Sequence, residues 1–489
     1  MNGVGVVDVA IVGAGFAGLG LAIRLRRQGH GDFVLLERAG DVGGTWRDNR
    51  YPGVACDVPS HLYSFSFRPA PDWSRVFAPG AEIQHYLRTA AVDEGVAPHV
   101  RLGAEMRDAR WTGEDWEIDT AAGSWRARVL VLAAGRLTEP RIPDLPGLED
   151  FGGPVLHTAR WDPSFDPEGL RVGVVGTGAS AAQVIPRLAG RARELVVFQR
   201  TPAWVVPRGD RPYTRAERTR FTRDPAAARA HRQDIFDDAE RAIAARRRVR
   251  PAIDELRTRA RTHLHTQVTD PGLRARLEPG YEIGCKRIVL SDELYPALDR
   301  DDVTLEDSAL TAVGPGAARA ASGRRHELDA LVLATGFHTT RQPYAERVRG
   351  REGTLAEHWA GGMSAYASTA VHGFPNMFVL DGPNASLGHN SAVYMIETQI
   401  DYVLGALAHL RRAGGPLEVS AAAERAYVRD VDDAARDTVW LRGGCRSWYV
   451  DEASGRLTLL WPGSARSFRE RNARFDPTPY LGTAGAASA

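Results

Sequence analysis

Two segments of the chain carry the same succession of apolar and polar residues. In the first, an apolar run leads to a glycine turn, a stretch with apolar residues at helical spacing and a second apolar run: DVAIVG (8–13), GAGFAG (13–18), LGLAIRLRRQG (19–29) and FVLLER (33–38). In the second, the equivalent stretches are LRVGVVG (170–176), GTGASA (176–181), AAQVIPRLAG (181–190) and ELVVFQR (194–200). Each copy predicts strand, turn, helix and strand, the context of a dinucleotide-binding fingerprint.

The small residues of both turns have separate physical tasks. The first glycine permits a tight turn, the second lets the backbone approach a pyrophosphate, and the third lets the helix pack against the strand. The helix that follows offers N–H groups and the positive end of its dipole to the phosphates. These positions are Gly13, Gly15 and Gly18 in the first copy, and Gly176, Gly178 and Ala181, next to Ser180, in the second.

The residue that closes the second strand distinguishes the two copies. Glu37 and Arg200 each lie 24 positions after the first glycine of their turn. A carboxylate accepts hydrogen bonds from a ribose diol and repels a 2′-phosphate, whereas a guanidinium binds that phosphate. The first site is therefore predicted to bind FAD or NAD and the second NADP. The alternative for Arg200 is a solvated strand end without a ligand.

Further apolar runs place these units in a larger architecture. RVLVLAAG (128–135) and ALVLATG (330–336) have the form of strands that return to the nucleotide sheets, whereas the region around 215–277 is rich in Arg, Ala and acidic residues. We predict an α/β fold with two Rossmann-like dinucleotide-binding domains, the second carrying a helical insertion. The expected FAD domain is 1–145 and 338–489, the NADP domain 146–214 and 280–337, and the insertion 215–279. The small, polar tail (482–489) is predicted to be disordered.

Composition mainly excludes other classes of protein. The 489 residues are 43% hydrophobic, and 62 basic against 61 acidic side chains leave a net charge of +1, which gives no argument for nucleic acid as a partner. No stretch is long and apolar enough to predict a membrane span, and no signal peptide is recognisable, so the expectation is a cytoplasmic protein. No metal-ligand cluster is evident, and the sequence does not determine the oligomeric state.

Cysteine and lysine usage are both unusual. Cys56, Cys285 and Cys445 are too few and too scattered to predict a disulfide framework or a CxxC pair, and we interpret them as structural. Of the 62 basic residues, Lys286 alone is lysine. Either a coding bias toward arginine left one lysine by accident, or this position requires an ammonium group.

Two longer motifs lie between and beside the glycine turns. Residues 43–57 (GGTWRDNRYPGVACD) fit [A/G]GxWxxxx[F/Y]P[G/M]xxxD, and residues 151–162 (FGGPVLHTARWD) fit FxGxxxHxxxW[P/D]. With both glycine turns, they resemble the type I Baeyer–Villiger monooxygenases, a family of class B flavoprotein monooxygenases. The resemblance covers nearly the whole chain, including GPNASLGHNS (382–391) and GGCRSWYVD (443–451).

The resemblance implies an enzyme that uses FAD and NADPH. In this family a flavin C4a-peroxide, formed from O₂, attacks a small-molecule ketone and yields an ester or lactone. A sulfur- or nitrogen-oxygenating flavin monooxygenase is the alternative enzyme. A flavin disulfide reductase would need a CxxC pair, which is absent, and a flavoprotein that binds partners without catalysis is the remaining alternative.

The resemblance also implies residues for the reaction. A deprotonated peroxide needs a fixed cation that does not give up a proton, for which arginine is better suited than lysine. By family position this cation is Arg287, and Asp57 is the carboxylate that orients it. Lys286, Arg200 and Thr201 are expected to bind the 2′-phosphate of NADP.

The other expectations from the family are looser. Thr45 and Trp46 are expected near FAD, although Trp46 could equally be a core residue, and Trp440 resembles the loop tryptophan that closes over NADP. We interpret His157 as structural, not catalytic. The turn 381–384 (DGPN) either lines the flavin edge or is a simple turn.

Overall fold

The computed structural model describes residues 4–481, so the predicted disorder of 482–489 lies outside the described residues. Its larger sheet contains the first glycine turn and mixes parallel and antiparallel strands. Strands β1, β2, β6 and β18 are parallel, while β4, β5 and β6 form an antiparallel meander. The strand order is β17 (Val348–Arg349), β4 (Met106–Trp111), β5 (Trp116–Thr120), β6 (Gly123–Leu132), β1 (Gly5–Val12), β2 (Phe33–Leu36) and β3 (Val100–Arg101), with β18 (Met377–Val379) beside β6.

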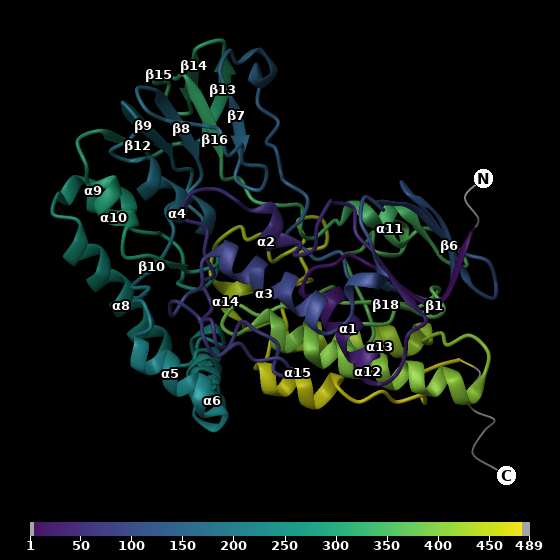
Figure 1. Ribbon diagram of the computed structural model, residues 1–489. Coiled ribbons are helices and arrows are strands. Elements are labelled where there is room, and N and C mark those ends of the chain that lie inside the picture. The colour runs from purple at the N-terminus through teal and green to yellow at the C-terminus, as the bar shows by residue number, and fades with distance from the viewer. Residues whose placement is uncertain (1–3, 482–489) are drawn as a thin grey trace.

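Helices cover this sheet on the side that Figure 1 shows below it. Helix α1 follows the glycine turn and packs against α12, a long helix from the C-terminal third of the chain. Buried apolar residues of both helices form one core cluster with those of the parallel strands. The helices of this unit are α1 (Phe16–Arg27), α2 (Thr45–Asp48), α3 (Gly80–Asp93), α11 (Leu355–His358), α12 (Ala392–Ala413), α13 (Ala421–Ala435), α14 (Val439–Arg442) and α15 (Ala465–Asn472).

The second sheet contains the second glycine turn and is entirely parallel. Its order is β12 (Val303–Glu306), β9 (Glu194–Phe198), β8 (Arg171–Val175), β16 (Ala330–Leu333) and β7 (Val155–His157). Helices α4 (Ala179–Leu188) and α10 (Leu294–Leu298) accompany it. Two small sheets complete the unit: β13 (Leu310–Gly314), β14 (Ala317–Ala320) and β15 (Arg325–Glu327), and the pair β10 (Val205–Val206) and β11 (Val289–Leu290).

A run of helices interrupts the second unit between β10 and β11. They are α5 (Arg215–Arg223), α6 (Pro225–Arg241), α7 (Ile243–Arg246), α8 (Ala252–Gln267) and α9 (Pro271–Leu277), and α5, α6 and α8 lie at the lower left of Figure 1. Local sequence sets their starts. Thr214 and Glu217 form a capping box at α5, and Asp224 caps α6 ahead of Pro225.

The predicted fold class is confirmed, because an α/β chain with two Rossmann-like units is what the structure contains. In chain order, the first sheet draws on residues 5–132 and 348–379, and the second on residues 155–333. We propose on this basis the division into a discontinuous FAD domain, an inserted NADP domain and a helical insertion within it.

The cysteines depart from the sequence-based interpretation. Cys285 and Cys445 form a disulfide, with their Cα atoms 6.2 Å apart, whereas Cys56 is a buried free thiol. A separation of 160 residues gave no local signal for this pair. The fold brings the two segments together because the end of α14 packs against the turn that precedes Lys286.

Candidate active site

A cavity of about 1440 Å³ lies where the two sheets face each other. Both glycine turns, the motif at 43–57, the segment 286–287 and the C-terminal residues 448–449 line it. The carboxyl ends of β1 and β8 point into this space, which is where open α/β sheets bind nucleotides. The two predicted nucleotide sites therefore open into the same cavity.

The first glycine turn is shaped for close contact. A Cβ at Gly18 would lie 1.9 Å from the carbonyl oxygen of Gly13, and Gly13 itself has a φ of +105°. A Cβ at Gly15 would come no closer than 3.7 Å to the nearest atom, the Cα of Gly44, so this position faces the cavity. The backbone at Gly15 is open to a ligand, as the fingerprint predicts.

Glu37 is buried at the end of β2 and lines the cavity. It accepts a hydrogen bond from the backbone N–H of Ala14 at 2.9 Å and forms an ion pair with Arg47 at 2.8 Å. These contacts fix the carboxylate beside the glycine turn. Arg47 was missed by sequence reasoning, since nothing in the motif marks its partner.

The second glycine turn has the same geometry as the first, with open space at its second glycine. A Cβ at Gly176 would lie 2.7 Å from the carbonyl oxygen of Ala334, while no atom lies within 4 Å of one at Gly178. Ser180, Arg200 and Thr201 line the same side of the cavity. The structure thus brings together all the residues predicted for the second site except Trp440.

Thr45 and Trp46 begin the short helix α2 beside the first turn. The Trp46 side chain is buried, lines the cavity and donates from its indole nitrogen to the Tyr63 hydroxyl at 3.3 Å. The ring also packs edge-on against Tyr63. Trp46 therefore belongs to the hydrophobic core and to the cavity wall, which reconciles its two sequence-based interpretations.

Arg287 and Asp57 form a direct ion pair in the cavity, although 230 residues separate them in sequence. The Nε of Arg287 donates to Oδ2 of Asp57 at 2.9 Å, and Nη2 donates to the same oxygen. Burial favours a protonated carboxyl, but the charge and hydrogen bonds of Arg287 and the charge of Arg208 hold the pKa of Asp57 below its usual value. The charge of Asp57 in turn raises the pKa of Arg287. Both groups are therefore charged.

Lys286 lines the cavity next to Arg287 and is half-buried. Its ammonium lies 5.1 Å from the centre of the Tyr281 ring. Burial, together with the charge of Arg200, lowers its pKa. In the described part of the chain neither Lys286 nor Arg200 has an ion-pair partner within 4.0 Å, so two cations face the second glycine turn uncompensated.

Trp440 lies apart from the other residues expected at the second site. Its side chain is only 2% exposed, packs in the core against Gly388 and does not line the cavity. Trp448, eight residues later, is 36% exposed and does line it, together with the buried Tyr449. Of these two tryptophans, Trp448 is the one that lines the cavity, whereas helix α14 turns Trp440 inward.

An ion pair that the sequence did not suggest closes another side of the cavity. Arg136, which follows β6, pairs with Asp381, which follows β18. Burial raises the pKa of Asp381 despite the charge of Arg136. In the same turn, Asn384 donates from its amide to backbone carbonyls and is structural. The turn 381–384 thus both lines the cavity and stabilises the fold.

His157 is held by the backbone on both ring nitrogens. Nδ1 accepts from the N–H of Ala159 at 3.1 Å, and Nε2 lies 3.1 Å from the carbonyl oxygen of Gly336. Burial lowers its pKa to about 4, so the ring is neutral at physiological pH. The geometry fits a structural histidine that ties β7 to the end of β16.

Side chains and backbone of the cavity fit two dinucleotides. The open faces at Gly15 and Gly178 lie at the starts of α1 and α4, whose N-termini favour phosphate. Among residues 4–481, no cluster of His, Cys, Asp and Glu could hold a metal ion. Over the same residues, no helix has the length and apolarity to cross a membrane.

Comparison with known proteins gives close relatives. Residues 11–79 match the NAD(P)-binding Rossmann-like domain. A Baeyer–Villiger monooxygenase of Streptomyces coelicolor is 46% identical over 97% of this chain and 92% of its own. Among solved structures, oxidized steroid monooxygenase bound to NADP has a TM-score of 0.83 at 31% identity, covering 95% of this chain and 96% of that one. OTEMO in complex with FAD and NADP has a TM-score of 0.85 at 27% identity, covering 95% and 96%.

Proposed function

This chain belongs to the Baeyer–Villiger monooxygenase family, and we propose that the Arg287–Asp57 pair is its catalytic centre. The protein is an FAD- and NADPH-dependent Baeyer–Villiger monooxygenase, and its substrate class is a small-molecule ketone. The observation that carries the catalytic assignment is the ion pair between Arg287 and Asp57 inside the cavity that both glycine turns line. Oxygenation of sulfur or nitrogen, the alternative, is not favoured.

The cofactors would be held by residues already in place. FAD would lie on Gly13, Gly15 and Gly18 with its ribose at Glu37, and NADPH on the second turn with its 2′-phosphate at Arg200 and Lys286. When bound, FAD accepts a hydride from NADPH and activates O₂ for insertion beside the ketone carbonyl.

The chain's own residues supply charge and position at the reacting atoms. Arg287 carries a permanent positive charge and directs its guanidinium into the cavity, where it stabilises negative charge that develops on oxygen. Asp57 accepts two hydrogen bonds from Arg287, so it holds the guanidinium in one orientation inside the cavity. Because the pKa of Asp57 is lowered, its carboxylate is ionised at neutral pH.

The activity itself is tested by supplying purified enzyme with NADPH, O₂ and matched ketone and sulfide substrates. Formation of an ester or lactone in proportion to NADPH consumed is the expected result. Faster sulfide oxidation than ketone oxidation across a broad panel would instead support the heteroatom-oxygenating alternative.

Arg200 is predicted to set the preference for NADPH. Replacing Arg200 by Ala removes charge-assisted hydrogen bonds to a 2′-phosphate, so kcat/KM for NADPH should fall on the order of 10–100-fold while that for NADH changes little. Steady-state kinetics with both coenzymes measure this. Unchanged kinetics with both coenzymes would mean that Arg200 is only a solvated strand end, and equal losses for NADPH and NADH would mean that it does not recognise the 2′-phosphate.

The Lys286→Arg variant is predicted to keep its fold and FAD but to use NADPH less well. An ammonium group can keep its contact with a phosphate when the coenzyme moves, whereas a planar guanidinium donates hydrogen bonds in fewer directions. KM for NADPH should therefore rise about tenfold. The measurement is the KM and kcat for NADPH, with the FAD content of the purified variant as control. Values equal to those of the wild type would support an accidental lysine.

A further inference from the structure

We propose that Cys285 and Cys445 are a redox modification site, at which oxidation of two thiols pins the C-terminal loop 443–450 against the Arg287 segment. The pairing itself is independent of the proposed catalytic role of Arg287, but its expected effect on turnover rests on that role. The disulfide joins residues 160 positions apart, at a place where two separately anchored parts of the chain meet.

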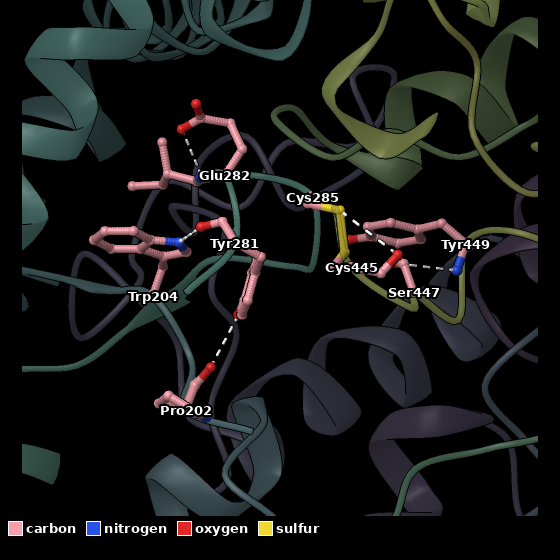
Figure 2. The surroundings of a disulfide bond; sticks show 9 residues. Pro202, Trp204, Tyr281, Glu282, Cys285, Cys445, Ser447 and Tyr449 are labelled. Carbon is pink, nitrogen blue, oxygen red and sulfur yellow. Dashed lines mark hydrogen bonds between the residues drawn. A yellow bond between two sulfur atoms is a disulfide. The ribbon is translucent and has the colours of Figure 1, made fainter. Parts of the chain in front are cut away.

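The first of these parts is the turn before the catalytic arginine, which is fixed to the second nucleotide unit. Figure 2 shows that the Trp204 indole donates to the carbonyl oxygen of Tyr281 and that the Tyr281 hydroxyl donates to the carbonyl oxygen of Pro202, at 2.8 and 3.1 Å. Glu282 accepts hydrogen bonds from Arg257 of the helical insertion. These hydrogen bonds therefore fix the backbone of the turn that contains Cys285, two residues before Arg287.

The second part is the loop that follows α14, and it carries side chains into the cavity. Trp448 and Tyr449 line the cavity that Arg287 also lines. Figure 2 shows the loop, with Tyr449 and Ser447, on the opposite side of the sulfur–sulfur bond from Tyr281. The disulfide thus lies between the anchor of Arg287 and the loop that presents Tyr449.

Among residues 4–481, an isolated bridge between Val450 and Leu457 and a few hydrogen bonds hold the backbone of this loop to its neighbours. The N–H of Glu282 donates to the carbonyl of Gly443 at 2.9 Å, and the Thr339 hydroxyl donates to the carbonyl of Trp448 at 3.1 Å. Single hydrogen bonds to a loop open readily. Tyr449 is also held by packing in the core, whereas Trp448 is exposed, so the disulfide is the covalent link that ties the exposed part of the loop to the segment before Arg287.

The two sulfurs also differ in access, as a modification site requires. Cys285 is 0% exposed, whereas Cys445 lies in a partly exposed turn beside the exposed Arg446. Small oxidants and reductants can therefore reach Cys445, while Cys285 acts from the interior as the resolving thiol. Cys56, the remaining cysteine, is 2% exposed and has no cysteine partner.

The oxidation balances with hydrogen peroxide as the oxidant. The Cys445 thiolate attacks one peroxide oxygen, the O–O bond breaks, and hydroxide leaves and takes up a proton to give water and a sulfenic acid on Cys445. The Cys285 thiolate then attacks that sulfur, the S–O bond breaks, and a second hydroxide leaves and is protonated to water. Two thiols are oxidised to one disulfide, and one peroxide is reduced to two waters.

The test begins with the bond itself and needs no turnover. Holoenzyme treated with hydrogen peroxide, or with dithiothreitol, is alkylated, digested with trypsin and analysed by mass spectrometry without reduction. Cleavage after arginine and lysine isolates residues 277–286 and 443–446, so the oxidised enzyme should give these two peptides joined and lighter by two hydrogens. Finding both peptides alkylated after peroxide treatment would overturn the proposal.

The second measurement asks whether the bond matters for catalysis. We expect KM for NADPH to be about tenfold higher in the reduced than in the oxidised enzyme, because the loop that carries the exposed Trp448 loses its covalent link, and a larger share of NADPH to appear as hydrogen peroxide. The rate of flavin reduction at saturating NADPH should stay the same. Equal kinetics in the two redox states would overturn the effect on the loop.

The matched control is the Cys285→Ser, Cys445→Ser double variant. It should behave like the reduced wild-type enzyme and should not respond to peroxide or dithiothreitol. A response of this variant would show that oxidation acts elsewhere, which contradicts the proposal. If no form of the enzyme converts ketones while the joined peptides are present, the proposed function fails and the disulfide assignment stands.

Discussion

Replacement of Arg287 by Ala is expected to lower kcat for ketone oxidation about 10²–10³-fold, because it removes the fixed cation that stabilises developing negative charge on oxygen. Asp57 would then remain in the cavity without its partner, which adds an uncompensated negative charge where an anion must form. NADPH should still reduce the bound flavin, since both glycine turns are unaffected. The measurement is ketone converted and hydrogen peroxide released per NADPH consumed.

Two features make this prediction specific. Nearly all reducing equivalents should leave the Arg287→Ala variant as hydrogen peroxide, while flavin reduction proceeds at the wild-type rate. The Arg287→Lys variant keeps the charge but loses the fork that binds Asp57 through Nε and Nη2, so it should retain partial activity. Near-normal ketone oxidation by the Ala variant would refute the assignment of Arg287 as the catalytic cation.

Replacement of Gly18 by Ala is expected to weaken FAD binding on the order of 100-fold, because α1 can no longer approach the glycine turn. A Cβ at this position would lie 1.9 Å from the carbonyl oxygen of Gly13, which is backbone and cannot move aside cheaply. The shift of the turn would also displace the N–H groups of α1 from the phosphates. The flavin retained after gel filtration, read from the ratio of visible to ultraviolet absorbance, measures the effect.

The chain offers a matched control for this substitution. Gly31 is exposed, and a Cβ added there would have no atom within 4 Å, so Gly31→Ala should purify with its full complement of FAD. The second glycine turn already carries Ala181 at the position equivalent to Gly18, and that residue is fully buried. If Gly18→Ala retained FAD as well as Gly31→Ala does, the close approach of α1 would not be needed for binding.

The fold could be predicted largely from local sequence. Hydrophobic periodicity and the two glycine turns require contacts only within about 30 residues, and such patterns specify strand, turn and helix directly. The contrast between Glu37 and Arg200 is equally local, because each side chain closes a strand that its own turn positions. For the same reason the helical insertion was predictable from its composition, and α5 to α9 lie within the predicted segment.

The proposed catalytic pair was predictable only through resemblance to a family. Nothing in the spacing of Asp57 and Arg287 indicates that they meet, since 230 residues separate them. The ion pairs of Arg136 with Asp381 and of Arg47 with Glu37 gave no signal at all. Each depends on where two strand ends or loops lie after folding, which residue type alone does not specify.

The C-terminal region shows most clearly which features follow from local sequence and which follow from tertiary structure. Helix α14 and the loop that follows it contain one tryptophan each, and only the rotation of α14 decides that Trp440 packs inward while Trp448 lines the cavity. The disulfide between Cys285 and Cys445 likewise exists because two segments 160 residues apart in sequence meet in the fold. Sequence by itself determined the two units and the charges they present, because those depend on short-range periodicity. Tertiary structure decided which distant side chains share the cavity, because packing between units depends on contacts that no local pattern encodes.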